Sequence, residues 1–245
     1  MIHVDDFGRS EKISRDILRK VKNGKISQVS VMLGFVDKKI LIELKRTKIP
    51  IRLHLNLTEQ VEKFSKDFSS MSFWGLMFAN RRKRHLVTKE IDRQVKEFME
   101  IYNLKKIRLD GHQHVHFIPW IYNYLCRKYI YNIYEMRYPV EPLHFISFRH
   151  TFSLQFFRNL IALLLLKIFS IFNEERTNQK FFGVLYTNMY DRTILHYQRK
   201  KFSSIVDKEI LLHIGVTETN EKNLFTRKQF NYHSSKQRKI ESDLL

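Results

Sequence analysis

The chain has 245 residues, of which 43% are hydrophobic and 13% aromatic. This composition excludes an intrinsically disordered chain and is sufficient for one domain with a sizeable core. A formal net charge of +19 would attract nucleic acid, anionic lipid or phosphorylated substrates, but Lys and Arg are spread along the whole sequence, so a solvated basic surface is the simpler interpretation.

The single cysteine, Cys126, limits the thiol chemistry of the chain. One thiol cannot form a disulfide within the chain, and the sequence has no cysteine pair of the kind that holds structural zinc. Near the N-terminus, Asp5 and Asp6 stand where a secretory signal would need its apolar core. We therefore expect a cytoplasmic protein.

The first part of the chain predicts alternating helices and strands. Residues 10–22 show helical periodicity, which Asn23-Gly24 ends in the usual manner of a helix C-terminus. A strand rich in branched residues follows at 26–33, a helix at 37–46 and another strand at 49–57.

The same alternation resumes in the middle of the chain. Apolar residues at helical spacing occupy 91–102, a strand is predicted at 107–110, Pro119 begins a helix, and 131–138 has the character of a strand. Strands that alternate with helices indicate an α/β fold with a parallel sheet or barrel.

Two later segments are distinctive. The most apolar stretch, 154–172, contains Arg158 and Lys167, and its uncharged part is short for a membrane span, so it predicts a helix. Packing in the core and docking on the inner face of an anionic membrane both stay open for this helix. Residues 221–245 are polar and basic without a clear period, so we expect a loose C-terminal tail after a domain of residues 1–220.

Polar residues occur where predicted strands end. Asp5 and Asp6 precede the first helix, His54 lies in a strand before a polar turn, and DGHQHVH (110–116) begins at the end of the strand 107–110. In parallel α/β folds these strand ends share one edge. A carboxylate and two imidazoles are a standard ligand set of catalytic metals, so Asp6, His54 and a histidine of DGHQHVH form a candidate metal site.

The three histidines of DGHQHVH do not all fit one ion. If the segment is extended, residues 112, 114 and 116 share one face at intervals of about 6 to 7 Å. One ion would therefore take one ring, and the other two would line the pocket.

Several blocks also resemble a known family. VDDFGRS (4–10), HLNLTE (54–59) and DGHQHVHFIP (110–119) resemble the signature blocks of the YdjC-like carbohydrate deacetylases. Three further blocks resemble the family's arginine-containing strand, its glycine-containing block and its late strand-end histidine: EMRYPVEP (135–142), FFGVLYTNMY (181–190) and EILLHIG (209–215). The collinear resemblance implies an irregular TIM-like (β/α) barrel in a single domain, with the first strand truncated before the aspartate pair.

By position, the resemblance implies metal ligands and catalytic residues. It implies Asp6, His54 and His112 as ligands of one divalent ion, Mg²⁺ or Zn²⁺. It implies Asp5 as the general base and His213 as a proton donor.

Other residues are candidates for substrate contact. The resemblance implies His114 and Arg137 in this role, and His116 is equally compatible with packing behind the site. Phe73, Trp74 and Phe78 could stack on a sugar, and we expect Trp74 to do so.

The implied reaction is metal-dependent hydrolysis of an N-acetyl group on an amino-sugar-containing saccharide. The alternative is a catalytically impaired binder of saccharide or anionic lipid with the same fold, for which the basic run at 81–84 is the densest feature. The sequence contains no recognisable nucleic-acid-binding module, so a nucleic-acid partner is not expected. A homodimer stays open as the oligomeric state.

Overall fold

A curled parallel sheet organises the chain. The computed structural model describes residues 1–60, 67–146, 148–205 and 207–245. In these residues seven strands pair in the order β5-β4-β3-β2-β1-β7-β6, and every pair is parallel. The strands are β1 (Ile2–Phe7), β2 (Gln28–Val31), β3 (Ile51–Leu55), β4 (Ile107–Gly111), β5 (Ile133–Met136), β6 (Lys180–Phe182) and β7 (Lys208–Leu212).

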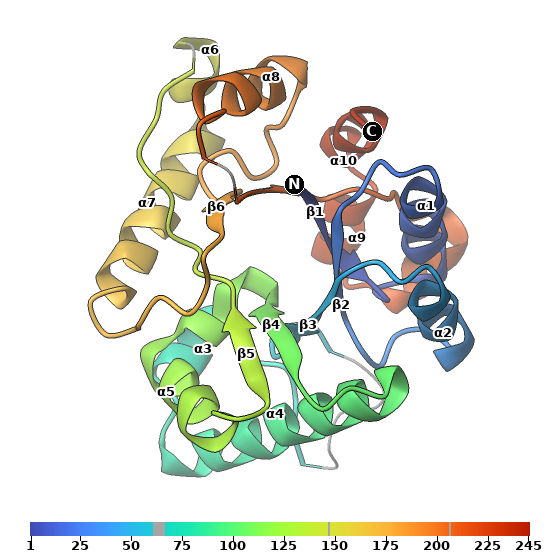
Figure 1. Cartoon of the computed structure of the whole chain (residues 1–245), viewed down its shortest axis with the longest axis vertical. Helices are drawn as coiled ribbons and strands as arrows, with labels where there is room; N and C mark the ends of the chain where they lie inside the picture. Colours follow the sequence, from blue (N-terminus) through green and yellow to red (C-terminus); the bar gives the residue numbers. More distant parts are fainter. Residues whose placement is uncertain (61–66, 147, 206) are drawn as a thin grey trace.

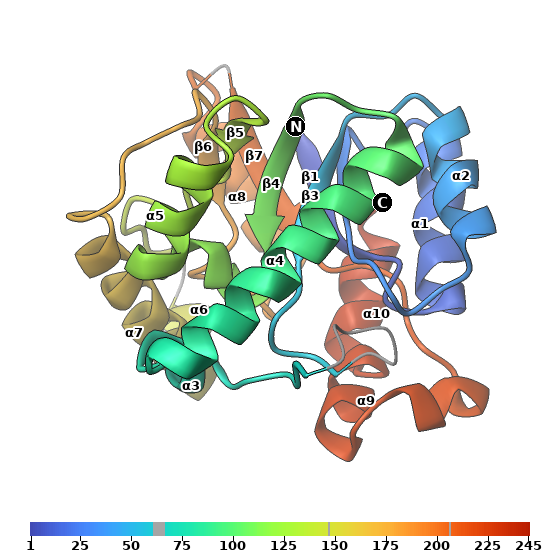
Figure 2. The same ribbon diagram turned by 90° about the horizontal axis from the view of Figure 1, so that it is seen from below.

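Helices surround this sheet, as Figures 1 and 2 show. Within the described ranges no ladder joins β5 to β6, so the predicted irregular TIM-like barrel is confirmed as a curled half-barrel. The helices are α1 (Glu11–Lys22), α2 (Lys38–Arg46), α3 (Phe73–Met77), α4 (Arg81–Tyr102), α5 (Pro119–Lys128), α6 (Phe148–Thr151), α7 (Leu154–Phe169), α8 (Arg192–Lys201), α9 (Arg227–His233) and α10 (Lys236–Asp243), with 3₁₀ turns η1 (His112–Phe117) and η2 (Thr219–Leu224).

Local sequence explains most element boundaries. The Ser10 side chain accepts the Ile13 N–H at the start of α1, and Asn23 ends that helix. Asp37 caps α2 in the same way. The predicted strands and helices between residues 10 and 57 and between 91 and 138 are confirmed; the strands predicted at 26–33, 49–57 and 131–138 are shorter than expected, and β4 is one residue longer. The short first strand includes the aspartate pair and lies between β2 and β7.

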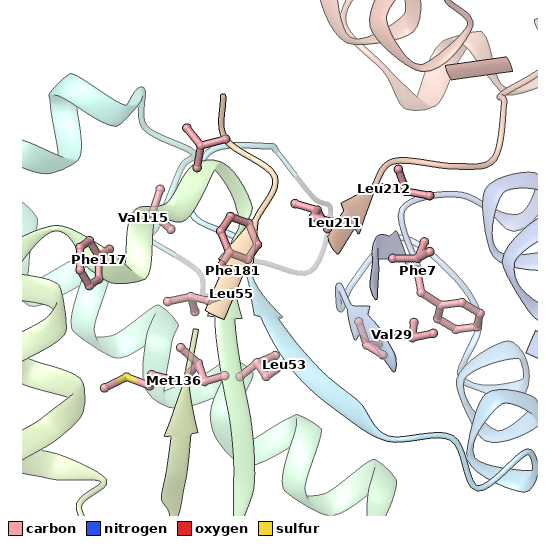
Figure 3. Packing of buried hydrophobic residues seen from close by; sticks show 14 of the residues in the cluster. Phe7, Val29, Leu53, Leu55, Val115, Phe117, Met136, Phe181, Leu211 and Leu212 are labelled. Carbon is pink, nitrogen blue, oxygen red and sulfur yellow. The ribbon is translucent and has the colours of Figure 1, made fainter. Parts of the chain in front are cut away.

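The two faces of the sheet differ in chemistry. Side chains alternate along each strand, and one face carries apolar residues such as Val29, Leu53 and Leu109. The other face buries polar and charged groups, among them Arg52 and Glu209. Figure 3 shows the apolar packing that surrounds the strands. A buried charged face requires paired charges, and this face carries the candidate site.

The segment 112–117 is not extended. It forms the 3₁₀ turn η1, in which Gln113 and His114 have left-handed φ values of 52° and 57°. Val115 and Phe117 are fully buried and anchor the turn in the core (Figure 3). The expectation of one shared histidine face is therefore wrong, because the turn directs the three rings differently.

The C-terminal segment is not a loose tail. It forms η2, α9 and α10, and the side chains of His233, Arg238 and Glu241 are fully buried. Arg238 donates to the Asp6 carboxylate at 2.9 Å and to the carbonyl of Gly215 at 3.0 Å. The segment lacks apolar periodicity because buried polar contacts fix it.

Arg238→Met tests this packing. We expect the free energy of unfolding to fall by about 3–5 kcal/mol, because Asp6 would stay buried without its cation. Lys239→Met changes an exposed residue of the same helix and should cost less than about 0.5 kcal/mol. Denaturant unfolding followed by circular dichroism measures both, and equal small losses would contradict the docking of α10.

The buried carboxyl group of Glu141 should make the free energy of unfolding depend on pH. Its buried carboxylate accepts the N–H groups of Gly183, Val184 and Leu185 after β6. Burial raises the pKa of Glu141 from 4.5 to about 7, so the folded chain binds more protons than the unfolded chain between these values. The resulting stability is present at low pH and is lost as pH rises through about 7.

In Glu141→Gln, the fall in unfolding free energy between pH 5 and pH 8 should therefore be smaller by up to about 3 kcal/mol. Glu100→Gln on the exposed part of α4 is the control and should keep the wild-type profile. Denaturant titrations at a series of pH values give the comparison, and identical slopes for the two variants would refute the prediction.

Candidate metal centre

Three predicted ligands meet at the carboxyl edge of the sheet. Asp6 comes from the end of β1, His54 from β3 and His112 from the first position of η1. One ligand atom of each lies within 4.8 Å of the others. His54 Nε2 is 3.8 Å and His112 Nδ1 is 3.6 Å from Asp6 Oδ1. The parallel strand ends thus bring together residues up to 106 positions apart.

These atoms fit a divalent cation. The ligands of a tetrahedral zinc ion lie about 3.4 Å from one another, since each bond is about 2.1 Å long. Asp6 Oδ1 is buried and accepts no hydrogen bond from the described residues. A buried carboxylate oxygen that faces two imidazole nitrogens without a donor is the arrangement that a bound cation would satisfy.

Carboxylates behind both imidazoles orient them. His54 Nδ1 lies 2.7 Å from Asp110 Oδ1, and this pair forms across neighbouring strands in register. His112 Nε2 lies 3.3 Å from Glu59. A histidine that binds a metal through one nitrogen usually donates its other N–H to such a carboxylate. Both rings therefore have the tautomer-fixing partners of a metal ligand.

The same carboxylates explain the pKa values of the rings. Burial favours neutral imidazole, but Glu59 and Asp6 raise the pKa of His112 to about 10. The pKa of His54 is also raised, against the effect of burial, by Asp5 and Asp110. The carboxylates around both rings thus favour positive charge at the place where a metal ion would bind.

A backbone irregularity turns the side chains of both Asp5 and Asp6 toward His54. Neighbouring strand residues normally point to opposite faces. Asp6 has a left-handed φ of 68°, and the pairing of β1 with β2 shifts register there. As a result Asp5 Oδ2 and Asp6 Oδ1 both lie 3.8 Å from His54 Nε2. The left-handed conformation of Asp6 therefore allows two consecutive aspartates to face the same cluster.

Gly8 fixes the turn that follows. Its φ is +91°, and a Cβ there would lie 2.2 Å from the carbonyl oxygen of Met32. Only glycine fits this close approach. The turn leads to Arg9, which pairs with Glu59, so the loop also holds the carboxylate behind His112.

Asp5 is held by an arginine. Arg137 donates two parallel hydrogen bonds of 2.9 Å to its carboxylate and also contacts Asp110 and Glu209 at 2.8 Å. Burial opposes ionisation of Asp5, but Arg137 and His54 hold its pKa well below the usual range. Arg137 is itself 1% exposed, so the structure favours a positioning role over the substrate contact suggested by the sequence.

The second acidic cluster, His3 with Asp5 and Asp110, is already neutralised by that guanidinium. His3 Nε2 lies 2.6 Å from the Ser30 hydroxyl, which in turn donates to Asp110 at 2.5 Å. The carboxylates of this cluster already have cationic and hydroxyl partners. The cluster therefore holds neighbouring side chains in place and does not resemble a second metal site.

The other histidines differ in position. His116 is buried and its Nε2 lies 2.9 Å from the carbonyl of Arg137, so it is a packed residue. His114 is partly exposed, and its Nδ1 has no hydrogen-bond partner among the described residues. His213 follows β7 and lies near the charges of Asp6 and Asp5, while burial lowers its pKa to about 4. It is therefore neutral at pH 7.

Trp74 lies in α3, which packs against η1, and it is 56% exposed.

Sequence reasoning missed Glu59, Asp110 and Arg238 as residues that contact the candidate site. Asp110 and Glu59 stand inside the quoted blocks, and the strand register could have assigned Asp110 to His54. No pattern in the sequence around Arg238 indicates its contact with Asp6.

Comparison with known proteins identifies a related sequence and a related fold. A curated relative from Danio rerio named carbohydrate deacetylase is 31% identical over 159 residues, which are 59% of this chain and 51% of the relative. The chain thus spans about half the length of that relative. A solved structure from Enterococcus faecalis V583, provisionally named a cellobiose-phosphate cleavage protein, covers 100% of this chain and 93% of its own with a TM-score of 0.56 and 16% identity. That likeness shows the fold.

The family assignment rests on the full length of the sequence. The family model described as YdjC-like protein matches residues 1–245, including β1 with the aspartate pair and the C-terminal helices. The chain belongs to the YdjC-like family.

Proposed function

We propose that the protein is a metal-dependent hydrolase that removes the N-acetyl group of an amino-sugar-containing saccharide. The observation that carries the proposal is the Asp5 carboxylate beside the cluster of Asp6, His54 and His112. A potential base next to a cation site is the arrangement that amide hydrolysis requires. The name of the Danio rerio relative supports the same substrate class.

Asp6, His54 and His112 would hold the ion, and Mg²⁺ and Zn²⁺ are both compatible with their donors. When bound, such an ion polarises an amide carbonyl and makes water more acidic. Arg238 takes Asp6 Oδ2 and leaves Oδ1 to face the imidazoles, so Asp6 would act through one oxygen.

Asp5 is proposed to take the proton from the attacking water. Its two oxygens are fixed by Arg137, so the carboxylate cannot rotate away from the cluster. Its lowered pKa keeps it ionised at neutral pH. The reaction thus begins with the base in its active form.

The departing amine needs a proton. His213 is the proposed donor and is neutral at pH 7, so it would first have to receive the proton that Asp5 has taken. On the substrate side, the proposed contacts are His114, whose ring is partly exposed, and Trp74, whose exposed ring offers a surface on which a sugar can stack.

The function is tested by acetate release from a panel of N-acetylated mono-, oligo- and lipid-linked saccharides, with and without chelator. Acetate release that stops with chelator and returns with added metal supports the hydrolase. Saccharide binding without any acetate release would instead support the catalytically impaired binder.

Metal titration tests the ligand set. We expect His54→Ala and His112→Ala to weaken binding of added Zn²⁺ more than about 100-fold, because each removes a donor from a three-ligand site. His114→Ala, from the same turn as His112, is the matched control and should bind as the wild type does. Isothermal calorimetry measures the affinities, and wild-type affinity in either ligand variant would refute the assignment.

The two aspartates should give different phenotypes. Asp5→Asn should retain the ion and lose about 10²- to 10⁴-fold in acetate release, because an amide keeps the shape but cannot accept the proton. Asp6→Asn should lose the ion, since it removes the charged ligand. Metal content and acetate release are measured side by side. A fully active Asp5→Asn protein would exclude the mechanism, and one without metal would mean that the roles are reversed.

A further inference from the structure

The outer side of α7 is an exposed apolar strip. Its apolar side chains follow one another at intervals of three and four residues, and each is about half exposed or more. They continue beyond the helix end: Leu154 77%, Phe157 46%, Ile161 67%, Leu164 46%, Ile168 54%, Ile171 77% and Phe172 70%. Of the two interpretations left open for this segment, core packing holds only for the opposite side, where Phe156, Leu163 and Leu166 are buried. An apolar strip of this length on a folded surface indicates an interaction site.

Helix α3 packs against the buried side of α7 and carries exposed aromatic residues of its own. Phe73 stacks on Phe169 at the end of α7, with ring centroids 6.3 Å apart. Trp74 and Phe78 stack on each other and are 56% and 74% exposed. Figure 2 shows α3 beside α7. Exposed tryptophan next to aliphatic residues is typical of surfaces that enter the boundary of a bilayer.

A basic run follows directly on this aromatic end. Arg81, Arg82, Lys83 and Arg84 form the exposed first turn of α4, and that turn contains no acidic residue. Arg84 lies over the ring of Trp120, 5.0 Å from its centroid. The only charged residues in α7 itself are Arg158 and Lys167. Every charge of these segments is thus positive.

We propose that α7, α3 and the first turn of α4 together form a docking surface for an anionic lipid bilayer. The apolar strip would enter the acyl boundary while the basic run contacts the headgroups, and these two contributions together hold a protein at a membrane. A second copy of the chain fits less well, because pairing would bring two basic runs and two chains of +19 together. No helix in the described ranges is long and apolar enough to cross a membrane, so the contact is peripheral.

The surface adjoins the candidate metal centre through η1. Helix α3 packs against η1, which carries His112, and Trp120 of the following α5 donates its indole N–H to the Leu76 carbonyl of α3 at 2.9 Å. A bilayer held by α3 and α7 would therefore lie close to the turn that supplies a metal ligand.

Cosedimentation of the full chain with vesicles tests the proposal. We expect binding to vesicles of phosphatidylcholine with phosphatidylglycerol, weaker binding to phosphatidylcholine alone, and loss with rising salt. Ile161→Gln should lower the partition coefficient about tenfold, because one large apolar contact is lost. Ile42→Gln, an exposed isoleucine of α2 on another side of the molecule (Figure 1), should have no effect.

Charge-reversal variants test the contribution of the basic run separately. Arg81→Glu with Arg82→Glu should abolish the preference for phosphatidylglycerol, whereas Lys38→Glu with Lys39→Glu, the same charge change on α2, should preserve it. All four residues are exposed, and circular dichroism checks that each variant is folded.

Three results would overturn the proposal. The first is absence of binding to phosphatidylglycerol vesicles at low salt. The second is equal binding by strip variants and their controls. The third is a dimer in sedimentation velocity that Ile161→Gln dissociates while vesicles are not bound, which would assign the strip to a second copy. None depends on acetate release, so a failure here is distinct from a failure of the proposed hydrolase.

Discussion

The pairing of Arg137 with three buried carboxylates is the interaction on which the site depends. Asp5 comes from β1, Asp110 from β4 and Glu209 from β7, and one guanidinium reaches all three across the concave side of the half-barrel. Without it, Asp5 would have to bind a proton or be exposed to water, whereas Glu209 would keep its 2.8 Å contact with Arg52. The guanidinium thereby links carboxylates from three strands and favours their ionised form.

This network imposes a cost in stability that the chemistry requires. Buried ion pairs seldom stabilise a fold more than apolar packing of the same volume does. Here the ionised Asp110 fixes the ring of His54, and the ionised Asp5 faces the same cluster. An apolar core at these positions could stabilise the fold, but it would leave neither an oriented imidazole nor a base. The charged interior of the sheet is therefore best understood as support for the proposed catalysis.

The sequence predicted the features that local patterns encode. Caps such as Ser10 and the β/α alternation gave the elements, and parallel strand ends explain why Asp6, His54 and His112 converge. The left-handed turn at η1 and the docking of Arg238 could not be predicted. Positive φ is uncommon for non-glycine residues other than Asn and Asp, and at Gln113 and His114 it depends on the burial of Val115 and Phe117, which local sequence patterns do not reveal. A segment fixed by buried ion pairs shows no apolar periodicity.

The contact between Arg238 and Asp6 has a consequence for the order of folding. The two residues are 232 positions apart, so their pairing has nearly the largest sequence separation that this chain allows. During synthesis β1, β2 and β3 can pair early, whereas Asp6 has no arginine partner until almost the whole chain has been made. A nascent chain would in that interval present an unpaired acidic group together with two imidazoles. Asp6 would therefore reach its final electrostatic environment only when α10 docks.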